Sequence, residues 1–354
     1  MSVLADFALP FLRCLDPEKA HNMTLAALKA GLGPKAFADE DGRLVTKVWD
    51  MYFPSPIGLS AGFDKNAEVA DAMLDTGLGF VEVGSITPKA QDGNPKPRIF
   101  RLPKDGGVIN RLGFNNKGMH VAAKNLAHRY SSGIVGVNLG KNKTTEDAAS
   151  DYAVGAEKLS PFADYLVINV SSPNTPGLRA LQDKDELANL VIATLEARDK
   201  AMGEKRKPPL LVKIAPDLNS DDLSDIASLT LDMNIDGLIV SNTTISRPDS
   251  LKDKKTAEET GGLSGKPLME LSTDVLADVY KRTGGKIPLI GVGGVASGQD
   301  AYRKIRAGAS LVQLYSALVY HGPSLIPRIK RELSECLSKD GFENVGQAVG
   351  ADHR

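Results

Sequence analysis

The fold is decided by the stretch Tyr165-Leu-Val-Ile-Asn-Val-Ser-Ser-Pro-Asn-Thr-Pro-Gly177, in which an apolar run opens abruptly into polar and turn-forming residues. Its first four residues have the character of a strand that is buried on both faces. The serines, prolines and asparagine that follow cannot continue such a strand. We therefore expect a buried parallel strand that ends in a loop of polar side chains.

Short apolar runs of this kind recur along the chain and alternate with segments of helical periodicity, such as 183–202 and 268–283. The expected strands are residues 57–60, 79–83, 134–139, 165–170, 210–214, 237–241, 288–292 and 310–315. Strands that alternate with helices form βαβ units, and eight units predict a closed (β/α)₈ TIM barrel, an α/β fold. An open doubly wound sheet is the alternative, but no Gly-x-Gly-x-x-Gly follows the first strand.

Two segments lie outside the barrel repeat. Residues 89–111 are rich in Pro, Gly and basic side chains, and we expect a hairpin or lid there. The N-terminal extension has helical periodicity over 3–15 and 16–30, with Asp16 as the capping residue and Pro17 at the first helical position. It is either a cap on the barrel bottom or an amphipathic hairpin that faces a membrane or an apolar substrate. The predicted domains are this helical leader, residues 1–42, and the barrel, residues 43–354.

Bulk composition excludes several classes of function. The 354 residues carry 43 Lys+Arg and 44 Asp+Glu, and a net charge of −1 gives no electrostatic case for nucleic-acid binding. Cys14 and Cys336 have no metal-type spacing, which favours a reducing compartment. No apolar run approaches the ~18 residues of a spanning helix. Asp6 and Pro10 interrupt the apolar start, so we expect no secretory signal.

In a (β/α)₈ barrel the working residues lie at the C-terminal ends of the strands. At these ends the sequence places two lysines and a set of asparagines: Lys65, Asn138, Asn169, Asn174, Lys213 and Asn242. Amide side chains both donate and accept, so they suit a planar heterocycle with alternating C=O and N–H groups, whereas capping roles explain only one or two of them. Gly293 and Gly294 after the seventh strand, with Gly308 before the eighth, predict a phosphate site for a ligand such as flavin mononucleotide (FMN) or a sugar phosphate.

Metal and nucleophilic chemistry are less favoured. The histidines lie outside the strand ends and have no metal-ligand spacing: His21, His120, His128, His321 and His353. No Gly-x-Ser-x-Gly elbow or Ser-His-Asp arrangement is visible. The expected chemistry therefore uses Lys, Asn, Ser and a cofactor, without a metal.

Several longer motifs occur in a fixed order: Asp16-Pro-Glu-Lys-Ala-His21, Gly58-Leu-Ser-Ala-Gly-Phe-Asp-Lys-Asn66, Gly93-Asn-Pro-Lys-Pro-Arg98, Asn110-Arg-Leu-Gly-Phe-Asn-Asn116, Asn169–Gly177, Gly261-Gly-Leu-Ser-Gly265 and Gly291-Val-Gly-Gly294. Over nearly the whole chain the sequence resembles the dihydroorotate dehydrogenase family, specifically its membrane-associated, quinone-dependent class (class 2). The resemblance implies a barrel with one FMN per chain that oxidises (S)-dihydroorotate to orotate in pyrimidine (UMP) synthesis and passes the electrons to a quinone.

By motif position, the resemblance makes Ser172 the catalytic base, where the soluble class has a cysteine, and implies a proton relay through Thr175 with Phe114 nearby. It implies that the substrate contacts are Lys65, Asn110, Arg111, Leu112, Gly113, Phe114, Asn174, Asn242 and Thr243. It implies that the FMN contacts are Ala61, Gly62, Lys65, Ser85, Asn138, Asn169, Lys213, Ser241, Gly265, Gly294, Tyr315 and Ser316. Ser85 and Ser241 stand where other members have threonine, and the hydroxyl is retained. By strand alternation we expect Ser171 to be structural.

The resemblance also favours a leader that forms an apolar quinone tunnel, with His21 on the quinone side; a capping or surface role is the alternative for this histidine. It implies a peripheral protein on the cytoplasmic side of the cell membrane, and we expect a monomer that binds neither nucleic acid nor metal. Two other readings stay open: a different FMN or phosphate barrel, such as a 2-hydroxy-acid oxidase or a sugar-phosphate isomerase, and a non-catalytic barrel that docks on membranes. An oxidase of that kind should have a histidine base at a strand end.

Overall fold

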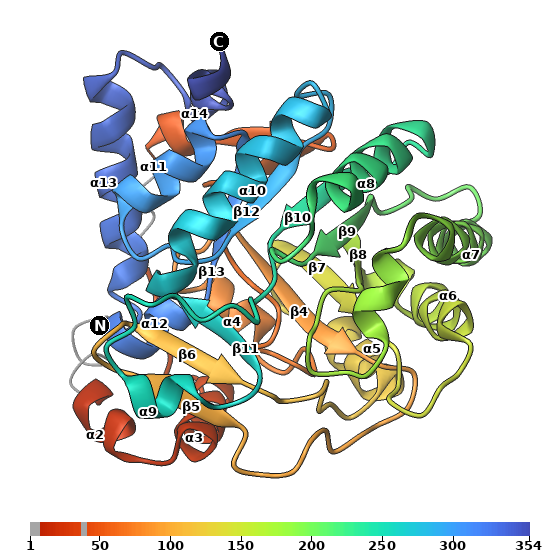
Figure 1. Cartoon of the computed structure of the whole chain (residues 1–354), viewed down its shortest axis with the longest axis horizontal. Helices are drawn as coiled ribbons and strands as arrows, with labels where there is room; N and C mark the ends of the chain where they lie inside the picture. The colour runs from red at the N-terminus through yellow and green to blue at the C-terminus, as the bar shows by residue number, and fades with distance from the viewer. Residues whose placement is uncertain (1–7, 37–40) are drawn as a thin grey trace.

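The computed structural model describes residues 8–36 and 41–354. Its centre is a closed barrel of eight parallel strands, arranged in the order of the sequence (Figure 1). The barrel strands are β3 (Ile57–Leu59), β4 (Phe80–Ile86), β7 (Ile134–Leu139), β8 (Tyr165–Asn169), β9 (Leu210–Ile214), β10 (Gly237–Val240), β12 (Leu289–Val292) and β13 (Ala309–Leu314). The predicted (β/α)₈ fold is confirmed, and the open sheet is excluded because β13 pairs with β3 and closes the barrel.

Helices surround the barrel and cover the outer faces of its strands, which is why the strands are apolar on both sides. The surrounding helices are α4 (Ala70–Leu74), α5 (Met119–Ala127), α6 (Ala148–Leu159), α7 (Lys184–Met202), α8 (Ser220–Asp232), α10 (Met269–Arg282), α11 (Gly298–Arg306) and α13 (Leu325–Lys339). Shorter helices are α9 (Lys254–Ala257), α12 (Ser316–His321) and α14 (Val345–Ala348), with 3₁₀ turns at Gly42–Leu44, Ser160–Phe162, Leu178–Gln182, Lys266–Leu268 and Ala351–His353. The helical patterns at 183–202 and 268–283 are confirmed as α7 and α10.

The bottom of the barrel is closed by a hairpin that the sequence analysis did not predict, β1 (Thr46–Val48) and β2 (Met51–Phe53). Phe53 packs edge-on against Phe80 with ring centroids 5.4 Å apart, and both residues are fully buried together with Tyr165. Gly136 makes room for this packing, because a Cβ there would lie 2.0 Å from the ring of Tyr165. Aromatic side chains thus fill this end, and the cavity lies at the other.

The lid expected over 89–111 is confirmed as an antiparallel hairpin, β5 (Ile99–Leu102) and β6 (Gly107–Asn110). A third strand, β11 (Gly262–Gly265), pairs with β6 and was not predicted. This small sheet lies over the C-terminal ends of the barrel strands, with Leu102, Ile109 and Leu263 in its own apolar cluster. This three-stranded sheet therefore covers part of the cavity.

The leader forms two helices, α2 (Leu9–Cys14) and α3 (Pro17–Lys29). The predicted cap of α3 is confirmed, since Oδ1 of Asp16 accepts a hydrogen bond from the backbone N of Lys19 at 2.9 Å. The first residues of the predicted 3–15 helix lie outside the described part of the chain. The alternative of a cap on the barrel bottom is wrong, because α2 packs on α12 and α3 packs on β5 and α4, at the opposite end (Figure 1).

Candidate active site

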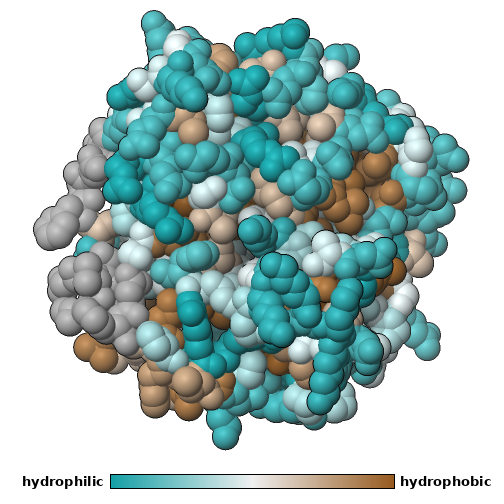
Figure 2. Space-filling model, turned by 60° about the vertical axis from the view of Figure 1, so that its left-hand side comes forward, coloured by the Kyte–Doolittle hydropathy of each residue, from teal (hydrophilic) through white to brown (hydrophobic). Residues whose placement is uncertain are grey.

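A cavity of about 660 Å³ lies at the C-terminal ends of the barrel strands. One wall consists of strand ends and loops, with residues such as Ser60, Lys65, Asn169, Ser172, Lys213, Asn242 and Gly294. The facing wall consists of α2 and α3, which contribute Leu9, Leu12, Ala20, Met23, Ala27 and Leu28. In Figure 2, hydrophobic side chains gather at the lower edge of the molecule, at the height of these helices. One cavity thus joins a polar wall to an apolar one.

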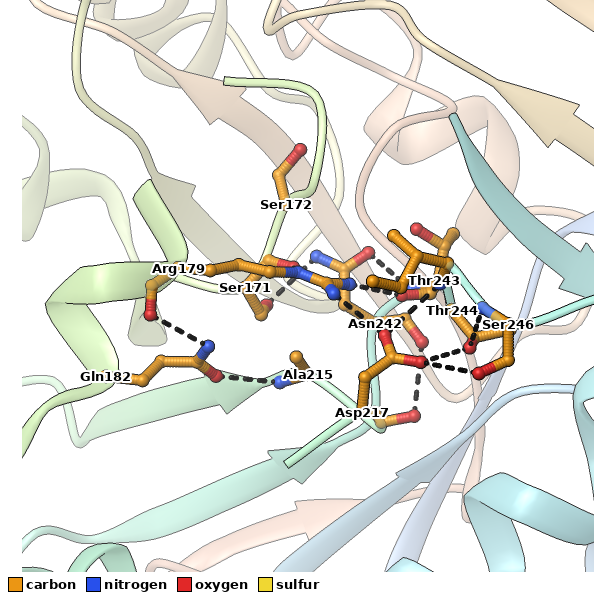
Figure 3. Close-up of polar contacts among 12 residues, drawn as sticks. Ser171, Ser172, Arg179, Gln182, Ala215, Asp217, Asn242, Thr243, Thr244 and Ser246 are labelled. Atoms are coloured by element: carbon orange, nitrogen blue, oxygen red, sulfur yellow. Dashed lines mark hydrogen bonds and ion pairs between the residues drawn. The ribbon is translucent and has the colours of Figure 1, made fainter. Parts of the chain in front are cut away.

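The two serines after β8 point in different directions (Figure 3). The Oγ of Ser171 donates to Oδ1 of Asn169 at 2.9 Å and accepts from Nδ2 of Asn242 at 3.0 Å. Ser172 lines the cavity, and its Oγ accepts a hydrogen bond from the backbone N of Asn174 at 3.3 Å. Strand alternation predicts this difference, and it leaves the Ser172 hydroxyl available to a ligand.

A buried carboxylate, Glu82, fixes the orientation of the amides behind the polar wall. Its Oε1 accepts from Nδ2 of Asn138 at 2.8 Å, and its Oε2 accepts from Nε2 of Gln313 at 2.7 Å. Because a carboxylate only accepts, Oδ1 of Asn138 must face the other way, where it accepts from Ser85 and from Asn169, the latter at 3.2 Å. The charge on Glu82 therefore sets the direction of hydrogen bonds across β4, β7 and β8.

Lys213, at the end of β9, supplies a buried amine. Its Nζ donates to Oγ of Ser60 at 3.1 Å and lies 3.8 Å from Oε1 of Glu82. Burial lowers the pKa of Lys213, and the negative charge of Glu82 opposes that change. Glu82 thus favours a cationic Lys213, which can stabilise negative charge on a ligand in the cavity.

Lys65 and His21 connect the two walls. Nζ of Lys65 donates to the carbonyl oxygen of Gly62 at 2.7 Å and lies 3.3 Å from Nε2 of His21 on α3. Burial lowers the pKa of Lys65 to about 8. Burial, and secondarily the nearby Lys65 charge, lower the pKa of His21 to about 3. At neutral pH Lys65 is therefore a cation that can bind a carboxylate, while His21 is neutral and accepts at Nε2.

Amides of the lid meet the loop that carries Ser172. Nδ2 of Asn174 donates to Oδ1 of Asn110 at 3.3 Å, and Nδ2 of Asn94 donates to the carbonyl oxygen of Asn174 at 3.1 Å. Phe114 follows the lid with a positive φ of 54° and borders the cavity beside Gly140. Donors and acceptors thus converge from the lid and from β8, as recognition of a small polar ring requires.

The loop after β12 has the backbone geometry of a phosphate site. Gly293 and Gly294 have φ of 109° and 82°, and a Cβ on Gly294 would lie 2.4 Å from Cβ of Met269, at the start of α10. Nearby, the hydroxyls of Ser264 and Ser316 lie 2.8 Å apart. Without a Cβ at Gly294 this loop packs directly on the first turn of α10, and the loop after the seventh barrel strand is a usual place for a phosphate in this fold. With the amine and amides of the strand ends, these residues fit a flavin-type group that carries a phosphate.

The structure brings most of the predicted site residues into one cavity. The lining includes the predicted Phe114 and Ser172, the predicted substrate contacts Lys65, Asn110, Leu112, Gly113, Asn174, Asn242 and Thr243, and His21. It also includes Ala61, Gly62, Ser85, Asn169, Lys213, Ser241, Gly265, Gly294, Tyr315 and Ser316. Among the described residues, three predicted members stand outside this lining. Asn138 lies behind the lining and is hydrogen-bonded to the lining residue Asn169, and Thr175 is buried. Arg111 forms an ion pair with Glu259 at 2.6 Å, and its guanidinium lies over the ring of Phe100.

Sequence reasoning missed three charged or polar groups. Glu82 interrupts the apolar run of β4, and a charge inside a fully buried strand could have indicated its role. Gln313 likewise interrupts the apolar run of β13 and is fully buried. Arg101 of β5 donates to the carbonyl oxygens of Arg13 at 2.9 Å and Leu15 at 2.8 Å, which fastens the end of α2. A basic residue on a lid strand gave no signal for that contact.

Two absences apply to residues 8–36 and 41–354. No group of three or more His, Cys, Asp or Glu side chains there is placed to hold a metal ion. No helix within the same residues is both long and apolar enough to cross a membrane.

Comparison with known proteins gives consistent results. A family model described as "Dihydroorotate dehydrogenase" matches residues 43–337. "Dihydroorotate dehydrogenase (quinone)" of Rhodospirillum rubrum is 56% identical over 98% of this chain and 94% of its own length. "Dihydroorotate dehydrogenase (quinone), mitochondrial" of Arabidopsis thaliana is 53% identical over 98% of this chain and 81% of its own length. The crystal structure of DHODH from Eimeria tenella in complex with ferulenol superposes with a TM-score of 0.92 at 45% identity, covering 96% of both chains.

Proposed function

The chain belongs to the dihydroorotate dehydrogenase family, and from this premise we propose how it oxidises dihydroorotate to orotate in pyrimidine biosynthesis, with a quinone as electron acceptor. It is an oxidoreductase with a flavin-type cofactor, and we assign this cofactor as FMN, one per chain. The glycine loop after β12 favours a single phosphate group, and no Gly-x-Gly-x-x-Gly for a dinucleotide follows the first strand.

Residues on the polar wall would hold the flavin. Lys213, Ser85 and Asn169 offer an amine, a hydroxyl and an amide to the flavin ring, while Gly265 and Gly294, which also line the cavity, would lie beside the phosphate. The other proposed contacts are Ala61, Gly62, Lys65, Asn138, Ser241, Tyr315 and Ser316. When bound, the flavin supplies the redox chemistry, accepting a hydride from C6 of the substrate and passing two electrons to the quinone.

The side chains around Ser172 would bind and orient the substrate. The cationic Lys65 pairs with the carboxylate, and the amides of Asn110, Asn174 and Asn242 bind the ring C=O and N–H groups. Thr243 completes this set, with the backbone of Leu112, Gly113 and Arg111 forming the edge under the lid. Such fixed contacts bring C5 of the ring into one orientation relative to the base.

Ser172 would take the C5 proton while the hydride leaves C6, and together these losses form the C5–C6 double bond. A serine hydroxyl is a weak base, so its own proton must move on as it accepts another. We assign that relay to Thr175, with Phe114 limiting the access of bulk water. The neutral His21 and the apolar side chains of α2 and α3 would bind the quinone on the facing wall.

The observation that carries this proposal is the continuity of the cavity. Its lining runs from Ser172 and Asn169 on the polar wall to Ala27 and Leu28 of α3 on the apolar wall. A polar ring and an apolar electron acceptor can therefore both reach a flavin between them. We propose residues 1–42 as the quinone-binding unit and 43–354 as the catalytic barrel.

The exposed apolar residues of the leader support a peripheral membrane location. Phe11 and Leu32 line the cavity and are 60% and 74% exposed, so apolar surface of the cavity wall reaches solvent at the leader. A helix pair of this kind can rest on a bilayer surface, where quinones are dissolved. We propose docking on the cytoplasmic side of the cell membrane by a monomer.

An anaerobic titration tests the function. The purified protein should be yellow, dihydroorotate should bleach the flavin absorbance, and a quinone should restore it. A colourless protein would favour an isomerase-type barrel, and a yellow protein that dihydroorotate does not bleach would favour another flavin enzyme or a binding module. Deletion of residues 1–42 should spare the bleaching and abolish the restoration by quinone; undiminished quinone turnover would refute the tunnel.

A further inference from the structure

One arginine anchors the loop that carries Ser172. Arg179 lies in the 3₁₀ turn Leu178–Gln182, and its guanidinium reaches back beneath the loop (Figure 3). Its Nε donates to the carbonyl oxygen of Ser171 at 3.0 Å, and its Nη2 donates to the carbonyl oxygen of Thr243 at 2.9 Å. The first carbonyl belongs to the neighbour of the proposed base, and the second to a proposed substrate contact.

Asp217, after β9, holds this guanidinium in place. Its Oδ2 accepts from Nη1 of Arg179 at 2.8 Å and from the backbone N of Ile245 at 3.2 Å. Its Oδ1 accepts from the hydroxyls of Thr244 and Ser246. The side chains of Arg179 and Asp217 are 22% and 11% exposed, so solvent screens this pair only in part.

The same turn is fastened a second time through Gln182. Oε1 of Gln182 accepts from the backbone N of Ala215 at 2.9 Å, and its Nε2 donates to the carbonyl oxygen of Arg179 at 3.2 Å (Figure 3). The loops after β8, β9 and β10 are therefore joined beneath the polar wall. A flat guanidinium with donors on three nitrogens in a fixed geometry is suited to bridging them, whereas the donors of a lysine all radiate from a single nitrogen and cannot match acceptors spread around a guanidinium.

We propose that Arg179 and Asp217 are positioning residues for the proposed reaction: they form a clamp that fixes Ser172 relative to Thr243 and so to the bound substrate. Neither side chain lines the cavity, so the clamp acts through the backbone of Ser171 and Thr243. The inference rests on the proposed function, because it assigns the clamp to removal of the C5 proton. Small displacements of a base from its target atom cost about 100-fold in rate.

The test compares Arg179→Lys and Asp217→Asn with the unmodified holoenzyme in the two half-reactions. Flavin reduction by dihydroorotate should slow by about 100-fold in either variant. Reoxidation of the reduced flavin by quinone should be unchanged. With substrate deuterated at C5, the isotope effect on reduction should rise, because proton removal has become slower relative to the other steps.

The chain offers a matched control in the pair of Arg129 and Asp71. Nε of Arg129 donates to Oδ1 of Asp71 at 2.8 Å, Nη2 donates to the carbonyl oxygen of Ser131 at 3.1 Å, and the pair lies away from the cavity lining. Arg129→Lys should leave both half-reactions and the isotope effect unchanged. Thr244→Val is a milder variant, which removes one contact of Asp217 and keeps both charges, so it should give a smaller slowing of reduction.

Two results with the folded Arg179→Lys variant would overturn the clamp, and a third applies if that variant does not fold. The first is flavin reduction at the unmodified rate in Arg179→Lys. The second is an equal slowing of both half-reactions with an unchanged isotope effect, which is what a smaller fraction of folded enzyme produces. If Arg179→Lys and Asp217→Asn do not fold, an unmodified reduction rate in Thr244→Val overturns the proposal. Failure of the proposed function is distinguishable, because the unmodified protein would then not be reduced by dihydroorotate at all.

Discussion

The two walls of the cavity differ in how they are held. On the barrel wall, Asn169 and, behind it, Ser171 and Glu82 are buried, and hydrogen bonds tie their polar atoms to neighbouring strands and loops. On the leader wall, Phe11 and Leu32 are exposed, and α3 is joined to the lid by an ion pair between Glu18 and Arg98. The barrel wall therefore presents directional hydrogen-bonding groups, and the leader wall presents an apolar and partly exposed surface.

This difference matches what each proposed ligand needs. A ring that must lose a proton from one face requires donors and acceptors in fixed positions. An apolar electron acceptor that enters from a bilayer and returns to it needs apolar contact area more than directional hydrogen bonds. The two walls meet at Lys65 and His21, whose Nζ and Nε2 atoms lie 3.3 Å apart.

Changes on the barrel wall should have the largest effects, and Ser172→Ala the largest of all. Loss of the base should slow flavin reduction by dihydroorotate by about 10²–10⁴-fold, the range of general acid–base catalysis. Flavin content and reoxidation by quinone should stay normal, as stopped-flow absorbance will show. Ser171→Ala is the structural comparison, and near-normal reduction in Ser172→Ala would remove Ser172 from the role of base.

Changes on the leader wall should affect the reoxidation of the flavin by quinone. Ala27 of α3 lines the cavity, whereas Ala26 next to it is exposed to solvent. Ala27→Phe should fill the apolar side and raise the quinone KM about tenfold, a cost typical of overpacking. Steady-state kinetics with a soluble quinone will measure this, with Ala26→Phe as the matched control. Equal effects of the two substitutions would contradict a quinone site between α3 and the barrel.

The sequence predicts these two walls unequally. The eight barrel strands are predictable because each is a run of apolar residues buried on both faces, as in β8. Strand β11 is not, since Gly262–Gly265 is short and rich in glycine, and its partner β6 lies about 150 positions earlier in the chain. Tertiary pairing alone makes it a strand.

The same distinction applies to the site. Ser172 and Lys213 are predictable because barrel geometry gathers strand ends, and the family resemblance adds their roles. Arg179 and Arg101 are not, because an arginine in a turn or on a lid strand has the pattern of a solvated side chain. Their contacts with distant carbonyl oxygens exist only after the chain has folded.

The junction between the walls should respond to pH through Lys65. Its pKa is lowered to about 8 by burial, so the free enzyme loses this cation as the pH rises through that value. Because the substrate carboxylate binds the cationic form, orotate affinity should fall by up to about tenfold per pH unit above about 8. Titration of the flavin absorbance with orotate between pH 6 and about 9.5 measures this; a flat affinity over that range would contradict the assignment.

The smallest expected effect concerns the attachment of the leader. Nη2 and Nε of Arg98 donate to the two carboxylate oxygens of Glu18 at 2.7 and 3.0 Å, and this hydrogen bonding lowers the pKa of Glu18. A lowered pKa means that the stabilisation is present above the ordinary value near 4.5 and is lost as pH falls through the lowered one. Glu18→Gln should therefore lower the free energy of unfolding by about 1 kcal/mol at pH 7, and by less near pH 4.

Hydrogen exchange of the backbone amides in Glu18→Gln will show which part of the molecule loses stability. Protection should fall in α3 and remain unchanged in β8, because the ion pair fastens the leader and not the barrel. Glu270→Gln is the matched control, since Glu270 also pairs with an arginine through both carboxylate oxygens but is 73% exposed. Loss of this exposed pair should change the free energy of unfolding little. An equal loss of protection in α3 and β8 would mean that the two walls unfold as one unit, and the contrast between them would then lie in chemistry alone.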